Sequence, residues 1–187
     1  MERMKRFGIY YLPPAESALG RFGAEWLGWD AELGRALRPA DLPELPLDWE
    51  RITEAPWHYG FHGTLKPPFR LAAGRRGEEL AEAVAEFARG VAPFEMPPLA
   101  PRVGHGFLSL RPSAACPALD ALAAACMEMF EPFRAPPDAD ELARRRQAGL
   151  TARQEAMLVR WGYPYVMEEF HFHLTLTGNL GDLVAAQ

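Results

Sequence analysis

The sequence contains very little cysteine: Cys116 and Cys126 are the only two in 187 residues. Two cysteines do not make the disulfide framework of a small secreted domain, and no Cys-x-x-Cys motif is present. We therefore expect two buried, unreactive thiols in a protein of the reducing cytoplasm.

Long apolar runs and nucleotide-binding loops are also missing. The apolar stretch at residues 7–12 is too short for a signal-peptide core or a membrane span, so we expect no membrane partner. No Gly-x-x-x-x-Gly-Lys-Ser/Thr, Gly-x-Gly-x-x-Gly or Gly-x-Ser-x-Gly motif occurs. P-loop folds, dinucleotide-binding folds and serine hydrolases therefore have little sequence support.

Positive charge is scarce as well. The net charge is −5, and Lys5 and Lys66 are the only lysines. This balance argues against an extended contact with duplex nucleic acid. It argues against an RNA end as well, and nothing in the sequence implies an obligate protein partner.

What is present is the composition of a soluble globular protein, 49% apolar and 24% charged, in a chain of one-domain length. Paired strands between helices predict an α+β fold with antiparallel sheets. Pro13, Pro67 and Pro112 are expected to end the strands before them, and a proline-rich surface connection is expected at residues 39–56. The predicted strands are 7–12, 61–66, 94–99, 106–110 and 165–177, and the predicted helices lie in 16–37 and over 76–89, 117–130, 138–147 and 151–162.

The most informative pattern is a histidine followed two residues later by a threonine. It occurs twice, as His62-Gly-Thr64 and His173-Leu-Thr175, where roughly 0.1 such coincidences are expected by chance. Both triplets lie in strand-like runs with apolar flanks. A period of two then places the histidine and threonine of each triplet on one face and the flanking residues in a core.

Such a pair suits the cleavage of a phosphodiester. In-line displacement at phosphorus needs a base on one side and an acid on the other, and histidine serves as either near neutral pH. Threonine hydroxyls can donate to the non-bridging oxygens, whose charge must be held in the transition state. No metal or other cofactor is required by this chemistry.

The paired motifs resemble those of the two-histidine (2H) phosphoesterase superfamily, which includes RNA-ligase-like enzymes and cyclic-nucleotide phosphodiesterases. Four longer strings are similar to a bacterial branch associated with phosphonate metabolism: Tyr59-Gly-Phe-His-Gly-Thr-Leu-Lys-Pro-Pro-Phe-Arg70, Glu141-Leu-Ala-Arg-Arg-Arg146, Trp161-Gly-Tyr-Pro-Tyr-Val166 and Phe172-His-Leu-Thr-Leu-Thr-Gly178. The resemblance runs from the first predicted strand to Gly178.

This resemblance implies one bilobal domain over residues 1–187, with two antiparallel sheets, flanking helices and a pseudo-two-fold axis. Each lobe would give one His-x-Thr strand to a central cleft. His62, Thr64, His173 and Thr175 would be catalytic, and the enzyme would be a phosphoric diester hydrolase acting on a small cyclic phosphodiester. For this branch a ribose cyclic phosphate of phosphonate catabolism is the implied substrate.

Several residues and alternatives stay open. Lys66 and His171 fall on the faces of the two triplets and are candidate substrate-binding residues. His171 and His173 also have the spacing of a strand metal site, although a required metal is the less favoured interpretation. Arg144, Arg145 and Arg146 are a phosphate-facing patch or a solvated helix face. The alternatives to small-molecule hydrolysis are processing of RNA 2′,3′-cyclic ends and a non-catalytic module that binds a phosphoryl ligand.

Overall fold

The four α-helices after residue 76 begin and end within one residue of their predicted bounds, whereas the helix predicted in 16–37 ends at Leu27 because residues 29–36 form a short antiparallel strand pair instead. The structure is a computed structural model that describes residues 5–37 and 49–181. For helix α6, Thr151 accepts the backbone N–H of Gln154 in a capping box, and Gly162 ends the helix with a left-handed φ of 74°. The helices of the described residues are α1 (Ala18–Leu27), α2 (Trp49–Trp57), α3 (Gly77–Gly90), α4 (Pro117–Met129), η1 (Glu131–Phe133), α5 (Ala139–Arg146), α6 (Ala152–Trp161) and η2 (Met167–Glu169).

Strands alternate with these helices and confirm the predicted α+β class. The larger sheet has the order β1-β4-β7-β6-β5 and the smaller one is the β2-β3 pair. The pairs β4-β7, β7-β6 and β6-β5 are antiparallel, as expected. The strands are β1 (Phe7–Tyr11), β2 (Trp29–Asp30), β3 (Arg35–Ala36), β4 (Gly63–Phe69), β5 (Leu99–Gly104), β6 (Phe107–Pro112) and β7 (Leu174–Thr175).

Several predicted strand boundaries are wrong. β4 continues through Pro67 and Pro68, and β6 includes Pro112. β7 pairs with β4 only at Gly63, so prolines farther along β4 interrupt no ladder with β7. The strand predicted over 165–177 is reduced to two residues, because η2 turns the chain at Met167, whose φ is 55°. The strand predicted at 94–99 starts only at Leu99.

The surface connection was predicted at 39–56, and its part up to residue 48 lies outside the described residues. Residues 49–56 are helical instead and belong to α2. Pro56 has no N–H to donate to the carbonyl of Ile52, which a helix would otherwise use. That carbonyl instead accepts the N–H of Gly178 at 2.6 Å. The helix therefore tolerates its proline because the chain after β7 satisfies the orphaned oxygen.

The chain divides into two units, each built from three segments. Unit 1 comprises Met1–Tyr10, Thr64–Met96 and Cys116–Phe172, and unit 2 comprises Tyr11–Gly63, Pro97–Ala115 and His173–Gln187. β4 enters unit 2 only with Gly63. The prediction of one bilobal domain with pseudo-two-fold symmetry stays a prediction.

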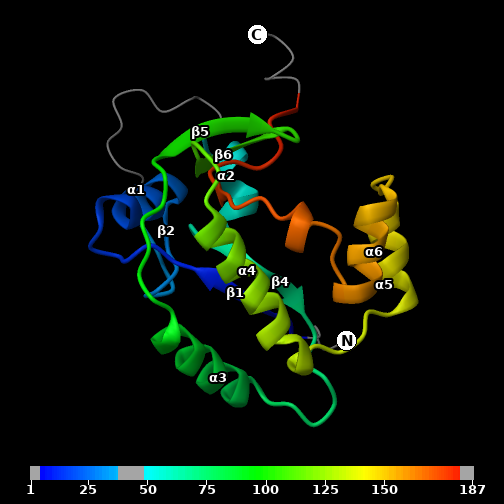
Figure 1. Cartoon of the computed structure of the whole chain (residues 1–187). Helices are drawn as coiled ribbons and strands as arrows, with labels where there is room; N and C mark the ends of the chain where they lie inside the picture. Colours follow the sequence, from blue (N-terminus) through cyan, green and yellow to red (C-terminus); the bar gives the residue numbers. More distant parts are fainter. Residues whose placement is uncertain (1–4, 38–48, 182–187) are drawn as a thin grey trace. The chain divides into compact units, whose positions relative to one another are not determined.

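In unit 1, helix α4 provides the centre of the core. Phe130, which follows it, packs edge-on against Phe87 of α3 with ring centroids 5.4 Å apart. Both cysteines are buried as predicted, and burial raises the pKa of the Cys126 thiol to about 11. Helices α5 and α6 lie side by side (Figure 1), joined by an ion pair between Arg146 and Glu155.

In unit 2, β5 and β6 form a hairpin (Figure 1) whose second strand pairs with β7. Phe61, Leu174 and Leu176 are buried, and the indole of Trp26 donates to the carbonyl of Leu176 at 2.8 Å. These contacts fix the backbone on both sides of the His-x-Thr segments.

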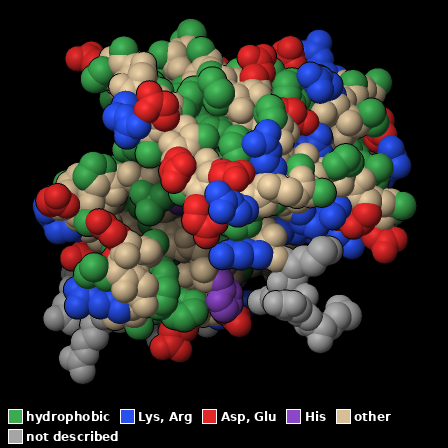
Figure 2. Space-filling view, turned by 90° about the horizontal axis from the view of Figure 1, so that it is seen from below, with side chains coloured by type: hydrophobic (Ala, Val, Ile, Leu, Met, Phe, Trp, Pro, Cys, Tyr) green, Lys and Arg blue, Asp and Glu red, His purple; other side chains and the backbone are tan. Residues whose placement is uncertain are grey.

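Basic and acidic side chains are mixed over the face drawn in Figure 2. Among the described helices, none combines the length and the apolar character needed to cross a membrane.

Candidate functional site

The pairing of β4 with β7 brings parts of the two His-x-Thr triplets together. Gly63 is the antiparallel partner of Leu174, so one further step in register places His62 level with Thr175. Gly63 and Leu174 are buried, whereas His62, His173 and Thr175 are partly exposed. The predicted alternation is therefore confirmed here: the flanking residues are buried, and the polar residues share the other face.

A pocket of about 300 Å³ in unit 2 lies at this face. His62 and Thr175 both contribute to its wall. His173 is not among the wall residues, but its ring lies 5.7 Å, centroid to centroid, from Phe107, which is. The wall consists of Ala55, Pro56, Tyr59, Gly60, His62, His105, Phe107, Thr175, Thr177, Gly178 and Asn179.

The surroundings of His62 define the chemistry of its ring. Nδ1 lies 2.9 Å from the carbonyl oxygen of Gly60. A carbonyl oxygen only accepts, so Nδ1 carries the hydrogen and the neutral ring keeps its lone pair on Nε2. Burial lowers the pKa of His62, the bond to Gly60 raises it in part, and the charge of His173 lowers it further. His62 is therefore mainly a neutral proton acceptor at pH 7, and His173 is near enough for the two charges to interact.

Arg111 is a functional candidate that the sequence reasoning missed. Ser109 pairs with Thr175 and Leu110 with Leu174, so the register places Arg111 of β6 level with His173. Its Nε donates to the Ser109 hydroxyl at 3.0 Å, and a Cβ on Gly104 would come within 3.2 Å of its Nη2. The glycine thus leaves room for a half-buried guanidinium on the face of His173 and Thr175. No local spacing signals this arrangement, since it depends on the pairing of distant strands.

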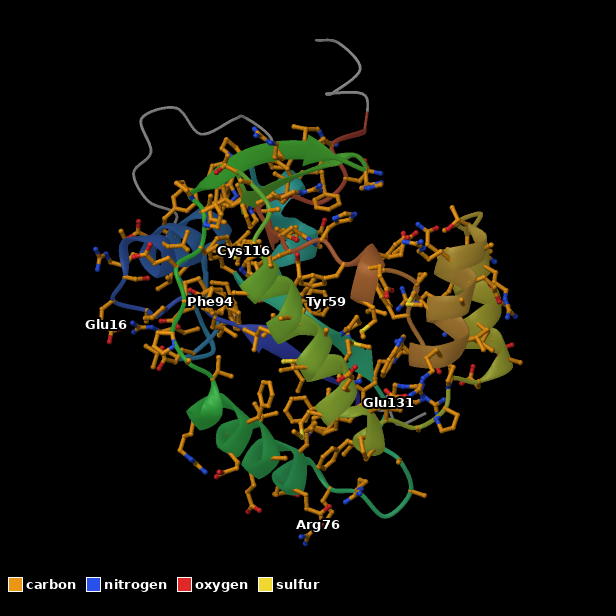
Figure 3. All side chains as sticks on the ribbon, viewed as in Figure 1. Glu16, Tyr59, Arg76, Phe94, Cys116 and Glu131 are labelled. Atoms are coloured by element: carbon orange, nitrogen blue, oxygen red, sulfur yellow. The ribbon has the colours of Figure 1, made fainter. Side chains whose placement is uncertain are left out.

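Three other wall residues were missed or set aside. His105, which is not among the predicted site residues, lies at the β5-β6 turn with a φ of 53° and contributes to the pocket wall. Gly106 follows with a φ of 80°, and a Cβ there would lie 2.8 Å from Oδ1 of Asn179, another wall residue. Tyr59 is 64% exposed and is labelled in Figure 3 just beyond α2. In the sequence, Gly106 indicates only a turn at this position, and nothing local indicates that the turn borders a pocket.

The remaining predicted site residues belong to unit 1. Thr64 follows Gly63 in β4 and is partly exposed, and His171 is exposed. Both histidines of the triplets thus belong to unit 2, whereas the resemblance implies one triplet per lobe.

Lys66, which was expected on the same face of the strand as Thr64, is buried, with only 1% of its surface exposed. Its ammonium donates to the Met127 carbonyl at 2.9 Å and to the Glu131 carboxylate at 3.1 Å. Burial lowers the pKa of Lys66, and Glu131 offsets part of that effect. A substrate-binding role for Lys66 stays a prediction, and such a ligand would have to compete with Glu131.

A metal site at His171 and His173 would need at least one more ligand. Within residues 5–37 and 49–181, no three His, Cys, Asp or Glu side chains lie together as a potential metal site. The described residues therefore offer no assembled ligand set to which these two histidines could belong.

Comparison with known proteins gives two curated relatives. One, from Janthinobacterium sp. (strain Marseille), is named ribose 1,5-bisphosphate phosphokinase PhnN and is 36% identical over 180 residues, which cover 96% of this chain and 40% of the relative. The other, from Laribacter hongkongensis (strain HLHK9), carries the same name and is 35% identical over 180 residues, covering 95% of this chain and 41% of the relative. The chain thus spans about two fifths of the length of these relatives.

No solved structure matches the chain. A family profile does match, over residues 64–187, and its description is "Protein of unknown function (DUF1045)". This matched region holds Thr64 and the whole second triplet, while His62 lies just before it. Because the match covers more than half of the chain, the protein belongs to the DUF1045 family.

Proposed function

We propose that the chain is a phosphoesterase that hydrolyses a small cyclic phosphodiester. The observation that carries the proposal is the pocket of unit 2, where the lone-pair nitrogen of His62 and the hydroxyl of Thr175 share one face with His173. Two titratable imidazoles and a hydroxyl donor are the groups that in-line displacement at phosphorus uses.

In the proposed reaction, Nε2 of His62 takes a proton from water as the water oxygen bonds to phosphorus. The bond from phosphorus to one ester oxygen breaks, and His173 donates a proton to that oxygen. One water is consumed, and the ring opens to a phosphate monoester and a free hydroxyl. The lowered pKa of His62 supports its role as the base, since it keeps Nε2 unprotonated near neutral pH.

The non-bridging oxygens carry the charge that must be held during this displacement. The hydroxyl of Thr175 and the guanidinium of Arg111 donate to them in the proposal. Thr64 has the same role by its place in the first triplet. The fixed position of Arg111 over Ser109 and Gly104 supports its part, because a guanidinium already held in place loses little freedom on binding.

The names of the relatives suggest the sugar. They are called ribose 1,5-bisphosphate phosphokinases, and the chain matches about two fifths of each. A 5-phosphoribosyl phosphate cyclised between C1 and C2 gives ribose 1,5-bisphosphate when water breaks the bond from phosphorus to O2. We assign the matched part to this ring opening, which would supply the compound named in the relatives. The absence of a P-loop motif from the chain agrees with a kinase located elsewhere in those longer proteins. The same substrate class fits the resemblance to the phosphonate-metabolism branch.

The test is a panel of cyclic phosphodiesters, including ribose cyclic phosphates and 2′,3′-cyclic nucleotides, assayed for release of a phosphate monoester. His62→Ala and His173→Ala should each lower kcat/KM by roughly 10²-fold or more. His58→Ala is the matched control, because His58 is exposed and outside the pocket wall. Full turnover by both site variants on every active substrate would refute the catalytic assignment. Saturable binding without any turnover by the wild type would instead support the non-catalytic alternative.

The exposed ring of Tyr59 favours a second candidate, a terminal 2′,3′-cyclic nucleotide of RNA. A tyrosine that is 64% exposed at the pocket wall offers a stacking surface for a base. Under this candidate, Tyr59→Ala weakens activity on 2′,3′-cyclic nucleotides and spares that on ribose cyclic phosphates. Activity on RNA ends should then also fall steeply as salt rises.

A further inference from the structure

Unit 1 contains a separate cavity of about 270 Å³ with an unusual concentration of cationic side chains. Glu131, labelled in Figure 3 just beyond the end of α4, lies beside a group of nitrogen-bearing side chains. The cationic residues of the cavity wall are Arg6, Lys66, Arg70, Arg134, Arg144 and Arg145.

Nearby carboxylates neutralise only part of this charge. Glu131 pairs with Lys66 at 3.1 Å and with Arg134 at 2.6 Å. Glu141 pairs with Arg6 at 2.5 Å and with Arg70 at 3.0 Å, and Asp138 lies 3.5 Å from Arg70. Six cations against these three carboxylates leave a formal surplus of three positive charges.

The surplus is concentrated on Arg144 and Arg145. Neither makes an ion pair with a carboxylate in the described part of the chain. The guanidinium carbon of Arg145 lies 4.5 Å from the ring centroid of Tyr163, another wall residue. This contact holds the side chain against the cavity wall by a cation–π interaction.

Helix geometry explains why two of the three consecutive arginines reach the cavity. Glu141, Arg144 and Arg145 of α5 are spaced i, i+3 and i+4 and so share one face of the helix. Arg146 lies on another face, where it pairs with Glu155 of α6 at 2.6 Å. The run is therefore divided between an ion pair joining two helices and a pair of guanidinium groups at the cavity.

We propose that this cavity is a binding site for a small phosphate monoester. Arg144 and Arg145 would hold the phosphate, whose charge approaches −2 at neutral pH and whose oxygens match guanidinium donors. Trp161 and Tyr163 of the wall provide apolar surface for the carbon part of the ligand. The volume suits a sugar phosphate rather than a polymer, because it lies just below the usual range of about 300–1,000 Å³ for drug-sized ligands.

Binding is tested by titration calorimetry with ribose 5-phosphate, and with inorganic phosphate as a second arm. We expect saturable binding of ribose 5-phosphate that weakens as salt rises. Arg144→Ala should raise Kd by roughly tenfold and the Arg144→Ala, Arg145→Ala double variant by roughly 10²-fold. Arg146→Ala is the matched control from the same helix and should bind within about twofold of the wild type.

The result is separable from the reaction proposed for unit 2, because the titrations are repeated in a His62→Ala background. Binding that is retained there and weakened roughly tenfold on adding Arg144→Ala assigns the ligand to the unit 1 cavity, even if no turnover is ever found. Circular dichroism and melting temperature monitor folding, and the single Arg144→Ala variant, which removes an exposed side chain, serves if the double variant unfolds. No saturable binding up to about 10 mM, or equal binding by the wild type and the Arg144→Ala variant, would overturn the proposal.

Discussion

Replacing Glu131 by glutamine tests the buried charge network of unit 1. The Glu131 carboxylate accepts from the ammonium of Lys66 at 3.1 Å and from Nη2 of Arg134 at 2.6 Å. Only 1% of the Lys66 side chain and 12% of the Arg134 side chain is exposed. Glutamine keeps the size of the side chain and removes the charge, so two poorly solvated cations lose their counter-ion.

The expected cost follows from burial. Removing one partner of a buried ion pair typically lowers the free energy of unfolding by about 3–5 kcal/mol. We expect the lower end because 20% of the Glu131 side chain is exposed. In a chain of this length, about 3 kcal/mol corresponds to a fall in melting temperature of roughly 6–12 °C. The loss would be a large part of a typical stability of about 5–15 kcal/mol.

The measurement is equilibrium unfolding in urea at pH 7, followed by circular dichroism. Glu86→Gln is the matched control, since Glu86 pairs with Arg89 at a site where both side chains are mostly exposed, and it should change stability by less than about 0.5 kcal/mol. The double variant Glu131→Gln, Lys66→Met should recover part of the loss, because it also removes the unpaired ammonium. Equal effects of Glu131→Gln and Glu86→Gln would refute the assignment of a buried, compensated charge.

The contribution of Glu131 to the free energy of unfolding should also depend on pH. Burial acts to raise the pKa of Glu131, but the hydrogen bond from Arg134 and the charge of Lys66 outweigh it, so the pKa lies below the ordinary value of 4.5. A carboxyl with a depressed pKa in the folded state stabilises the fold above its unfolded pKa, and this stabilisation is lost as pH falls through the folded pKa. The difference in unfolding free energy between wild type and Glu131→Gln should therefore be full at pH 7 and shrink below about pH 4.5.

Two further predictions concern unit 2. Because the pKa of His62 lies below 6.5 and the proposed base acts when neutral, kcat/KM of the proposed reaction should rise with pH along a limb below pH 6.5, measured on an active cyclic phosphodiester. A limb centred above pH 6.5 would contradict His62 as that base. Gly23→Ala in α1 should destabilise the fold by about 1–3 kcal/mol, since its Cβ would lie 1.9 Å from a ring carbon of Phe61, next to His62. Gly90→Ala, which meets nothing within 4 Å, is the control in thermal unfolding, and equal melting temperatures for the two variants would contradict the close contact.

Local signals predicted the bounds of α3, α4, α5 and α6 well because their causes are local. The capping box at Thr151, the proline at the start of α4 and the apolar stripe of α3 each act within a few residues. The strand boundaries were predicted less well, because a segment forms a strand only where another strand pairs with it. The segment 165–177 has strand-like residues, yet only Leu174 and Thr175 form strand, paired with β4 and β6.

Some features of the candidate site were likewise predictable from the sequence, and others were not. Period-two alternation was enough to predict that His62, His173 and Thr175 share a face. It was not enough to place Arg111, whose position depends on the register of β6 against β7. It also did not predict the burial of Lys66, because a strand position does not reveal whether a carboxylate at a helix end will pair with a buried ammonium.

The acid and base roles proposed for the two histidines could not be predicted from the sequence. The two triplets look equivalent in the sequence, and nothing in their spacing separates His62 from His173. The difference comes from their surroundings: the Gly60 carbonyl fixes the hydrogen of His62 on Nδ1, while the ring of His173 lies beside Phe107. Those neighbours come from a turn and from another strand, so the roles depend on the folded chain.

The net charge of the whole chain also does not reveal the charge at one place on the protein. A whole-chain charge of −5 argues against a long polyanion, which would extend over much of the surface. A phosphate monoester responds to charges within about one Debye length, roughly 8–10 Å at physiological salt. When the cations of the unit 1 cavity wall are counted together with the carboxylates that pair with them, a formal surplus of three positive charges remains. The acidic total of the chain is therefore compatible with the proposed phosphate site in unit 1.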